Sequence, residues 1–439
     1  MDKKALKELV CQQIDAHAAA VIDCVKSIGR EAELGFKEQK TAAKVTGFFD
    51  KLNIPYKKGL AITGVKGELG NGKRNIAVLG ELDAVLCAGH PQMNPENGAA
   101  HACGHNLQIG AMLAVAAGFA SSKVVEHLDG RVTFFAVPAE EYVELAYRNA
   151  LREQGKIKYL GGKQELIRLG EFDDIDISMM IHSQKNTPEN RVYIGKSSNG
   201  FIGKSIQYIG KTSHAAESPE MGINALNAAM LGLMGIHAMR ETFRDDDAIR
   251  VHPIITKGGD LVNSVPADVR LETYVRAKTM AAIDSTHGKV DQALRGGALA
   301  IGADVVIETT PGYLPLVSEL TMNDLFIENI KTVDPKVIID NIDHFGASTD
   351  MGDVSHIMPT IHPFTGGVNE ALHSKEFNVA DYNIAVIAPA KAMAMTVIDL
   401  LFDQAKVAEQ VLADFKPVFT KDEYIAKLDS YFSIEKTSN

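Results

Sequence analysis

The sequence predicts an α/β protein with a second, smaller domain inserted into the first. Three short segments are apolar throughout and have helical stretches between them: NIAVLGEL at 75–82, RVTFFAV at 131–137 and DISMMIH at 176–182. Such runs are typical of strands that are buried on both faces of a mostly parallel sheet flanked by helices. Between about 200 and 313 the pattern changes to strand, helix, two strands, helix, strand, which matches a split β-α-β-β-α-β unit.

The helices of the first domain are expected where apolar residues recur at helical spacing. These segments are LKELVCQQIDAHAAAVIDCVKSIG at 6–29, EQKTAAKVTGFFDKLN at 38–53, NLQIGAMLAVAAGFASS at 106–122 and the stretch at 385–412. Helices alternating with apolar strands indicate an α/β layer arrangement.

The inserted domain is expected to span 199–313, which leaves 1–198 and 314–439 for the first domain. The segment 201–211 alternates as a strand does, 222–239 is helical, and 250–259 and 267–277 form an expected antiparallel pair; a helix at 281–303 and a strand at 304–312 complete the set. The chain is expected to cross between the domains within GKSSNG at 195–200 and GYLPLVS at 312–318.

Composition excludes several classes of function. The net charge is -11, which argues against nucleic-acid binding, because phosphate backbones select clustered Lys and Arg. The N-terminal segment is polar and helix-patterned rather than a secretory signal, and we identify no membrane-spanning run of apolar residues. The four cysteines have no CxxC spacing. The sequence therefore predicts a reduced, cytoplasmic protein.

Residues suited to chemistry follow each of the apolar runs. In an open α/β sheet, ligands collect at the carboxyl ends of the strands. Asp83 follows the first run, Glu140 and Glu141 follow the second, and His182 ends the third. We therefore expect these side chains to meet at one edge of the sheet.

The loop that leaves Asp83 carries the segment HACGH just before a helix. Cys103 and His105 lie two residues apart on an expected non-helical turn, where Gly104 permits the backbone to bend. A thiolate, imidazoles and a carboxylate suit zinc, with manganese or cobalt as alternatives. A buried thiol beside a capping imidazole is the alternative for this pair alone. The joint arrival of these groups at one edge favours a metal site.

The two adjacent glutamates indicate hydrolysis. Taken alone, such a pair is usually a solvated helix start. Here, however, the pair follows a buried strand and a proline, where solvated helix starts are less usual. The side chains of adjacent residues on a turn or a helix start point in different directions, so one glutamate can bind a metal while the other reaches a metal-bound water. A bound ion lowers the pKa of that water, and a nearby carboxylate can take its proton and pass it to a leaving nitrogen.

Taken together, these motifs resemble the M20 metallopeptidase family, in particular its branch of aminoacylases, auxin-conjugate hydrolases and aminobenzoyl-glutamate hydrolases. The resemblance runs along nearly the whole chain. It rests on REAELGFKEQKTAAKVTGFF, GELDAV, HACGHN and PAEE, on GKTSHAAESPEMGINALNA and GGDLVNSVPADVRLETYVRA of the inserted domain, and on LHSKEF.

The resemblance implies two divalent ions and a ferredoxin-like lid that forms a homodimer. The ligands it implies are Cys103, His105, Glu141, His182 and His373, of which His373 has the weakest local context. It gives Glu140 the role of general base, and Asp83 that of an acid that orients ligands. In the lid, His214 matches a histidine that reaches the partner's site and stabilises the oxyanion. Asn263 and Arg276 match positions that handle the substrate carbonyl and carboxylate.

The sequence also departs from many aminoacylases. Asn106 stands where many of them carry Asp, and GASTDMGDVSH at 346–356 replaces a shorter segment, which leaves the roles of Asp350, Asp353 and His356 open. Both features look like the aminobenzoyl-glutamate and dipeptidase subgroup.

The function expected from the sequence is dinuclear metal-dependent hydrolysis of the amide bond of an N-acyl or N-aroyl amino acid or of a dipeptide. The alternative is a catalytically silent relative that binds a small carboxylate or a metal as a sensor or scaffold. A zinc nucleobase deaminase is excluded, because no PCxxC follows the His-containing motif.

Overall fold

A computed structural model describes residues 1–185 and 190–438 of the chain, which divides into two compact units. Unit 1 comprises residues 1–196, 317–343 and 353–421, and unit 2 comprises residues 197–316, 344–352 and 422–439. The crossings at 196/197 and 316/317 fall within the two segments in which they are expected from the sequence. The division differs from the expected one in that residues 344–352 and the C-terminal residues 422–439 lie in unit 2.

The principal sheet of unit 1 is built from the expected apolar runs. Its order is β1-β2-β6-β3-β7-β16, and β6, β3, β7 and β16 are mutually parallel neighbours. The residues of β3 and β6 are almost all buried, as expected for strands covered on both faces. The strands span Tyr56–Leu60 (β1), Gly64–Gly70 (β2), Arg74–Glu81 (β3), Gly130–Val137 (β6), Ile177–Met179 (β7) and Thr360–Ile361 (β16).

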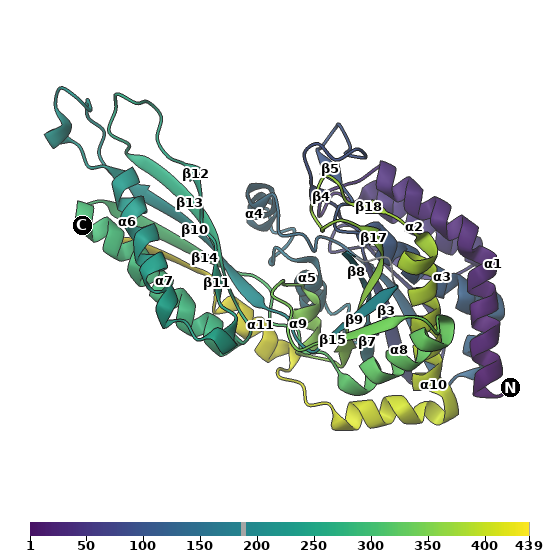
Figure 1. The fold of residues 1–439 in the computed structure, drawn as a ribbon. Helices are drawn as coiled ribbons and strands as arrows, with labels where there is room; N and C mark the ends of the chain where they lie inside the picture. The colour runs from purple at the N-terminus through teal and green to yellow at the C-terminus, as the bar shows by residue number, and fades with distance from the viewer. Residues whose placement is uncertain (186–189, 439) are drawn as a thin grey trace. The chain divides into compact units, whose positions relative to one another are not determined.

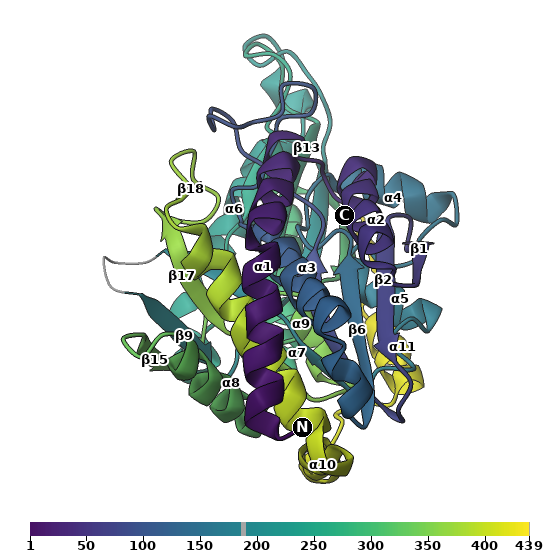
Figure 2. The ribbon, with the colours of Figure 1, turned by 90° about the vertical axis from the view of Figure 1, so that its right-hand side faces the viewer.

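Helices α1, α3 and α10 pack side by side in unit 1 and cover one face of this sheet (Figure 2). Helix α3 is buried along nearly its whole length, which explains why its sequence is apolar on all sides. The helices that lie wholly in this unit are α1 (Lys3–Arg30), α2 (Gln39–Leu52), α3 (His105–Ser122), α4 (Leu145–Glu153), α5 (Gly162–Leu169), α8 (Leu320–Val333) and α10 (Ala388–Asp414). Helices α9 (Met351–Ser355) and α11 (Lys421–Asp429) each begin in one unit and end in the other.

Helix α10 and the π-helical turn before it are long and apolar enough to pass a simple test for a membrane span. The segment tested is Asn383–Asp414, whose most apolar window has a mean hydropathy of 1.8 and is 83% buried. A core helix passes the same test, and burial of this extent is typical of one. The segment is therefore weak evidence for a membrane span.

A second sheet in unit 1 carries His182. The expected strand 176–182 is divided, because β7 ends at Met179 and His182 opens the next strand, which pairs in parallel with β17. This sheet comprises β8 (His182–Lys185), β9 (Arg191–Gly195), β15 (Ile338–Ile342), β17 (Phe364–Asn369) and β18 (Asn378–Val379), and a separate pair is formed by β4 (Val85–Leu86) and β5 (Ala99–Ala100).

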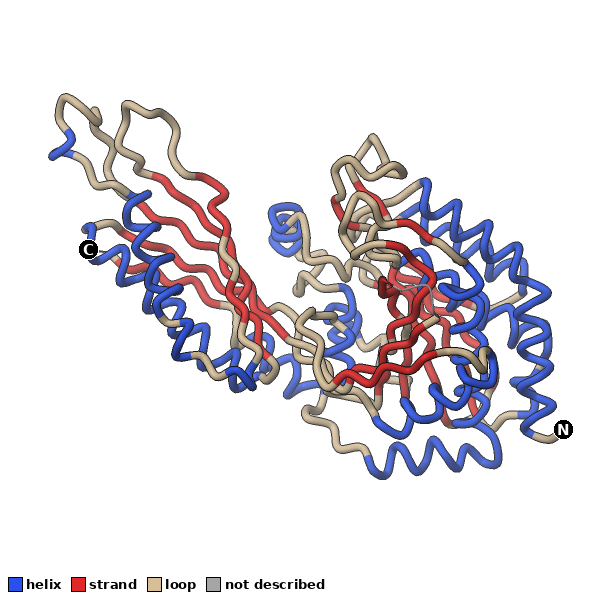
Figure 3. Tube along the Cα trace, viewed as in Figure 1, coloured by secondary structure: helices blue, strands red, loops and turns tan. Residues whose placement is uncertain are grey.

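Unit 2 has the expected β-α-β-β-α-β order, with one addition. Its antiparallel sheet runs β11-β13-β10-β14-β19, with β12 also paired to β13 (Figures 1 and 3). Helices α6 (Ala225–Ala238) and α7 (Met280–Ile301) pack on one face of this sheet. The strands are β10 (Gly200–Ile209), β11 (Arg250–Val251), β12 (Ile254–Lys257), β13 (Asp268–Ala277), β14 (Asp304–Pro311) and β19 (Ser433–Thr437).

Strand β19 explains why the C-terminal residues belong to unit 2. It pairs antiparallel with β14 from Val305↔Thr437 to Thr309↔Ser433. In the preceding helix, Lys427 Nζ donates to Asp284 of α7 at 2.9 Å. The segment 433–437 has five residues and no alternation of apolar and polar side chains, so its pairing could not be recognised from sequence.

Candidate metal centre

The turn after β6 presents Glu140 and Glu141 and is held by buried charged side chains. Arg148 of α4 is fully buried and donates hydrogen bonds to the carbonyls of Ala139, Glu141 and Leu160. Ala139 has a positive φ of 55°, and its N–H donates to the carboxylate of Glu38 at 2.9 Å. These contacts fix an irregular backbone, so the two glutamates emerge in defined directions.

The N-terminal motif supports this turn. Glu33 accepts hydrogen bonds from the N–H groups of Lys40 and Thr41, which anchors the start of α2. Glu38, just before that helix, is buried beside Thr63. Burial and the nearby charge of Asp83 raise the pKa of Glu38 to about 7. The motif therefore acts by packing under the site rather than by facing it.

Asp83 links the two strand-end motifs. Its side chain is fully buried and accepts a hydrogen bond from the N–H of Glu141 at 2.8 Å. The Nδ1 of His105 lies 3.0 Å from the carbonyl oxygen of Asp83 and 3.3 Å from its Oδ1. With Nδ1 donating to these oxygens, the Nε2 of His105 is left as the ligand atom, which is the arrangement typical of metal-binding histidines.

His182 is oriented in a similar way. Its Nδ1 lies 2.8 Å from the carbonyl oxygen of Ser183, and its Nε2 lies 3.6 Å from the Sγ of Cys103. Burial lowers the pKa of His182 to about 4, so the ring is neutral at physiological pH. A neutral imidazole is the form that binds a metal.

Gly104 makes the approach of Cys103 and His105 possible. Its φ is 83°, in the left-handed region that favours glycine, which is how it provides the bend expected at this turn. A Cβ at this position would lie 2.6 Å from the Oγ of Ser183. The residue is thus required both by its backbone conformation and by the close approach of β8.

We expect Gly104→Ala to weaken metal binding and to destabilise the fold by about 1–3 kcal/mol, since a non-glycine residue is strained in this conformation. Chemical denaturation of the metal-free protein and titration with a metal would measure the two effects separately. Gly155→Ala is the matched control, because its φ is also positive, at 70°, but a Cβ there meets no atom within 4 Å. Equal effects of the two substitutions would show that strain alone accounts for the loss.

Among the residues that the structure describes, three groups of potential ligand atoms lie in unit 1. In each group the atoms are all within 4.8 Å of one another. Two of the groups share Cys103, which therefore has the central position. The groups are Cys103, His105 and His182; Cys103, Glu141 and His373; and Glu81, His105 and Glu140. The structure thus brings together the five ligands implied by the resemblance, along with Glu140.

His373 reaches the cluster despite its weak sequence context. It has a φ of 62°, and its N–H donates to the carbonyl of Ala102 at 2.8 Å. Its Nε2 lies 3.0 Å from the Oε1 of Glu141, a contact that raises the pKa of His373. Its side chain is half-exposed, so it forms the outer side of the cluster.

The charge balance of the cluster fits a divalent cation. Four carboxylates (Glu81, Asp83, Glu140 and Glu141) and the thiol of Cys103 are buried there, and Lys163 pairs with Glu81. Burial and the charge of Glu141 raise the pKa of Cys103. Among the described residues, His105 Nε2 and Glu141 Oε1 are buried without a partner in hydrogen-bond geometry, although each has a contact at 3.0 Å, with Glu81 and His373 respectively. Buried acids and unsatisfied ligand atoms are what a metal centre requires.

Glu81 is a member of the cluster that the sequence patterns do not single out. It stands at the end of β3, within the run IAVLGEL, where it is expected only as part of the strand. The signal that could have found it is a carboxylate inside a segment otherwise expected to be buried. His362 is a second such residue: it is buried beside His182, and within the described residues neither ring nitrogen has a hydrogen-bond partner.

The lid residues implied by the resemblance lie in unit 2. His214 and Asn263 are exposed on neighbouring loops, which are joined by a hydrogen bond from Ala215 N to Asn263 O at 2.9 Å. The Nδ1 of His214 accepts hydrogen bonds from the N–H groups of Ala216 and Glu217. The neutral ring therefore carries its proton on Nε2, which makes that atom a hydrogen-bond donor.

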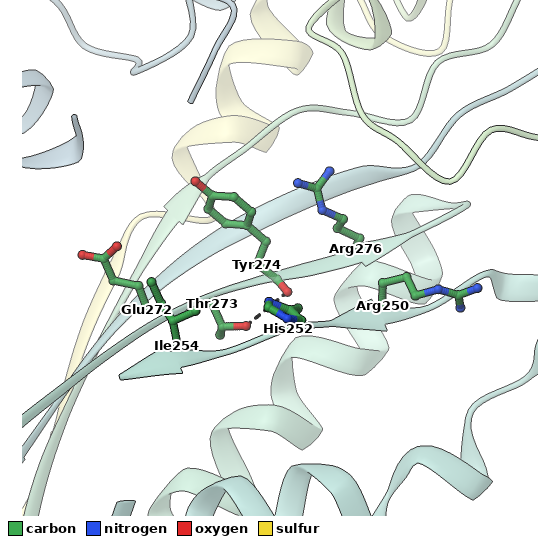
Figure 4. A pocket seen from close by; sticks show the side chains of 7 residues that line it. All are labelled: Arg250, His252, Ile254, Glu272, Thr273, Tyr274 and Arg276. Atoms are coloured by element: carbon green, nitrogen blue, oxygen red, sulfur yellow. Dashed lines mark hydrogen bonds between the residues drawn. The ribbon is translucent and has the colours of Figure 1, made fainter. Parts of the chain in front are cut away.

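Arg276 lies on the open face of the unit 2 sheet. Its guanidinium stacks over the rings of Phe201 and Tyr274 and donates to the Oγ of Ser348 at 2.7 Å. It lines a pocket of about 420 Å³ together with Arg250, His252, Ile254, Glu272, Thr273 and Tyr274 (Figure 4). Two guanidinium groups beside a hollow of this size suit a small carboxylate.

The three residues whose roles the sequence left open are all buried. Asp353 lies in unit 1 and accepts a hydrogen bond from Gln164, and His356 of the same unit stacks on Phe419. Asp350 belongs to unit 2. These contacts tie Asp353 and His356 into the interior of unit 1.

The chain is similar to known hydrolases along most of its length. The family model described as peptidase family M20/M25/M40 matches residues 77–396. An Xaa-Arg dipeptidase of Mus musculus is 28% identical over 433 residues, which cover 94% of this chain and 92% of that protein. A p-aminobenzoyl-glutamate hydrolase chain of Escherichia coli is 27% identical, with 77% of this chain and 80% of that protein covered.

The fold has a solved counterpart in a Bacillus subtilis protein described as a dinuclear metal-binding peptidase from the M20 family. The two structures match with a TM-score of 0.66 and 18% sequence identity, over 88% of this chain and 99% of that one. At this identity the likeness shows the shared architecture, which agrees with the α/β unit and the antiparallel second unit described above.

Proposed function

Because the chain belongs to the M20/M25/M40 peptidase family and is thus a metal-dependent hydrolase of C–N bonds, we propose that it cleaves the amide bond of an N-acyl or N-aroyl amino acid or of a dipeptide. The observation that carries the proposal is the meeting of Cys103, His105, Glu140, Glu141, His182 and His373 within unit 1. A silent binding protein would need metal ligands but no general base, which is the role that this proposal gives to Glu140.

The proposed chemistry assigns different roles to the side chains of the cluster. Two bound divalent ions would polarise the scissile carbonyl and lower the pKa of a water molecule. Glu140 takes a proton from that water and then gives it to the leaving nitrogen. Asp83 holds His105 in the required orientation through Nδ1 and positions Glu141 through its N–H.

Unit 2 is proposed to supply substrate contacts. In the homodimer proposed below, the Nε2–H of His214 would donate, in the partner's site, to the oxygen that develops negative charge, which typically contributes several kcal/mol to catalysis. Asn263, on the loop beside it, would contact the same carbonyl. Arg276 would bind the substrate carboxylate, as the pocket it lines with Arg250 supports.

A homodimer formed through unit 2 is part of this proposal. The outer side of α6 exposes Met230, Leu231 and Met234, and strand β12, which lies outermost beside β13, exposes Ile254 and Ile255. Exposed apolar residues on a helix and an edge strand are typical of a protein interface. A purified monomer with full activity would contradict the dimer. We also propose a cytoplasmic location, since all four cysteines are free.

The experiment that tests the proposal combines metal analysis with a substrate panel. The purified protein would be loaded with Mn²⁺, Zn²⁺ or Co²⁺, and its metal content per chain would be measured. Release of free amino acid would then be followed from N-acyl amino acids, from aminobenzoyl-glutamate and from dipeptides, including some that end in arginine. About two ions per chain with turnover of one substrate would support the hydrolase and begin to identify its substrate.

Two other outcomes of this experiment would count against the proposal. Bound metal without turnover of any substrate would favour the silent relative. No metal under any loading condition would mean that Cys103 is a buried thiol and that the cluster is structural.

A further inference from the structure

Glu81 is a buried carboxylate at the heart of the metal cluster, and the family resemblance assigns it no role. Its side chain is 1% exposed. It ends β3, two residues before Asp83, so it is placed by the central strand of the principal sheet. A charge this deep in a sheet is costly unless it is fully compensated.

Two residues hold the Glu81 carboxylate in place. Lys163 of α5, itself fully buried, donates to Oε1 at 2.5 Å. Gln108 of α3 donates through Nε2 to Oε2 at 2.9 Å and accepts the N–H of Glu81 at 3.1 Å. The carboxylate is therefore anchored by two different helices, with Oε2 directed toward the cluster.

The position of Oε2 relative to the ligand atoms fits a shared metal ion. It lies 3.0 Å from the Nε2 of His105, although this contact lacks hydrogen-bond geometry and Nε2 is left unsatisfied. Glu140 Oε2 lies 3.8 Å from the same nitrogen. Since bonds from zinc to nitrogen and oxygen are about 2.0–2.2 Å long, two ligands of one ion that subtend about 90–110° at the metal lie about 2.8–3.6 Å apart. The spacing of Glu81 and His105 is the spacing of two such ligands.

We propose that Glu81 contributes an oxygen ligand to the metal centre of this protein, and that Lys163 and Gln108 are positioning residues that hold it there. The inference rests on the proposed function, because it presupposes that the cluster binds divalent ions. The competing explanation is that Glu81 and Lys163 form only a structural ion pair, which would leave metal binding independent of the carboxylate.

The test compares two variants that both lack the lysine. Lys163→Met keeps the Glu81 carboxylate, whereas the double variant Glu81→Gln, Lys163→Met removes it without leaving a buried ammonium unpaired. Affinity for Zn²⁺ and Co²⁺ would be measured by competition with a chelator, and the visible absorption of bound Co²⁺ would report on the ligand set. Circular dichroism of the metal-free proteins would establish that each variant is folded.

We expect Lys163→Met to keep most of the wild-type affinity for both metals, because Gln108 still holds the Glu81 carboxylate and a cation that competes for it has been removed. The double variant should bind at least one ion about 10- to 100-fold more weakly and should show a changed Co²⁺ spectrum, since losing even a supporting residue commonly costs that much. Equal affinities and equal spectra for the two variants would overturn the proposal. If the wild type binds no metal, the proposed function itself fails. Failure of the proposed function is thus distinguished from failure of the ligand role of Glu81, in which the wild type and both variants bind metal equally.

A second variant covers the case in which the loss of Lys163 prevents folding. Glu81→Asp keeps the negative charge for Lys163 but withdraws the oxygens by about one bond length, so a ligand role predicts weaker metal binding with the ion pair retained. Glu165→Gln is the control, because Glu165 is also a buried carboxylate with a basic partner, Arg168, but belongs to no ligand group. Equal metal affinity of Glu81→Asp and wild type would contradict the proposal.

Discussion

Glu140→Gln is expected to remove nearly all turnover while leaving the metal content at the wild-type level. The carboxylate is buried in the turn that follows β6, and its Oε2 lies 3.8 Å from His105 Nε2, close enough to reach a water held at the cluster. Glutamine has the same shape but cannot accept the proton. General-base catalysis typically contributes about 10²–10⁴-fold, so kcat should fall by that factor.

The measurement is kcat together with metal content for the same preparation of protein. If Glu140→Gln retains its metal, Glu140 acts as a base rather than as a ligand. The geometry alone does not decide between these roles, because Glu140 belongs to one of the ligand groups. Glu144→Gln is the matched control: it changes a glutamate four residues away, whose carboxylate pairs with Lys37. Undiminished turnover in Glu140→Gln would remove Glu140 from the mechanism, and loss of metal would reassign it as a ligand.

Cys103→Ala is expected to lose metal as well as activity. Its sulfur belongs to two of the three ligand groups, so one substitution disturbs both sides of the cluster. Removing a ligand should weaken binding by more than the roughly 10- to 100-fold typical of a supporting residue. Metal content after dialysis, and turnover when metal is supplied in excess, would measure the effect.

Cys24→Ala controls for the loss of a thiol. Cys24 lies in α1, partly buried, and is not part of any ligand group. Burial raises the pKa of its thiol, as expected for an unreactive structural cysteine. Full metal content in Cys103→Ala would mean that the remaining side chains suffice, and the central position of the sulfur would then have no role in binding.

The meeting of the site residues in unit 1 could be predicted because it follows from sheet topology. Asp83 follows β3, and Glu140 and Glu141 follow β6, which is the parallel neighbour of β3. Parallel neighbours end at the same edge, so acids placed directly after apolar runs must lie close together. The approach of Cys103 to His105 within the HACGH motif could also be predicted without knowledge of distant contacts, since Gly104 provides the bend between them.

Other features depend on contacts that sequence patterns do not encode. Glu81 looks like one residue of an apolar strand until Lys163 and Gln108, which are 82 and 27 positions away, are seen beside it. His182 is expected from the sequence at the end of a strand, but it begins β8 because the chain passes to a second sheet after Met179. His373 could be placed only through the family resemblance, since a half-exposed loop residue has no periodicity.

Strand β19, near the C-terminus, protects the protein from self-association in solution. It covers the edge of β14, where main-chain groups between Val305 and Thr309 would otherwise be unpaired. An open strand edge invites pairing with other copies of the chain. Proteolytic removal of residues 433–437 would leave every candidate metal ligand in place but would expose the edge of β14. Self-association would therefore precede any loss of the metal centre in a clipped sample.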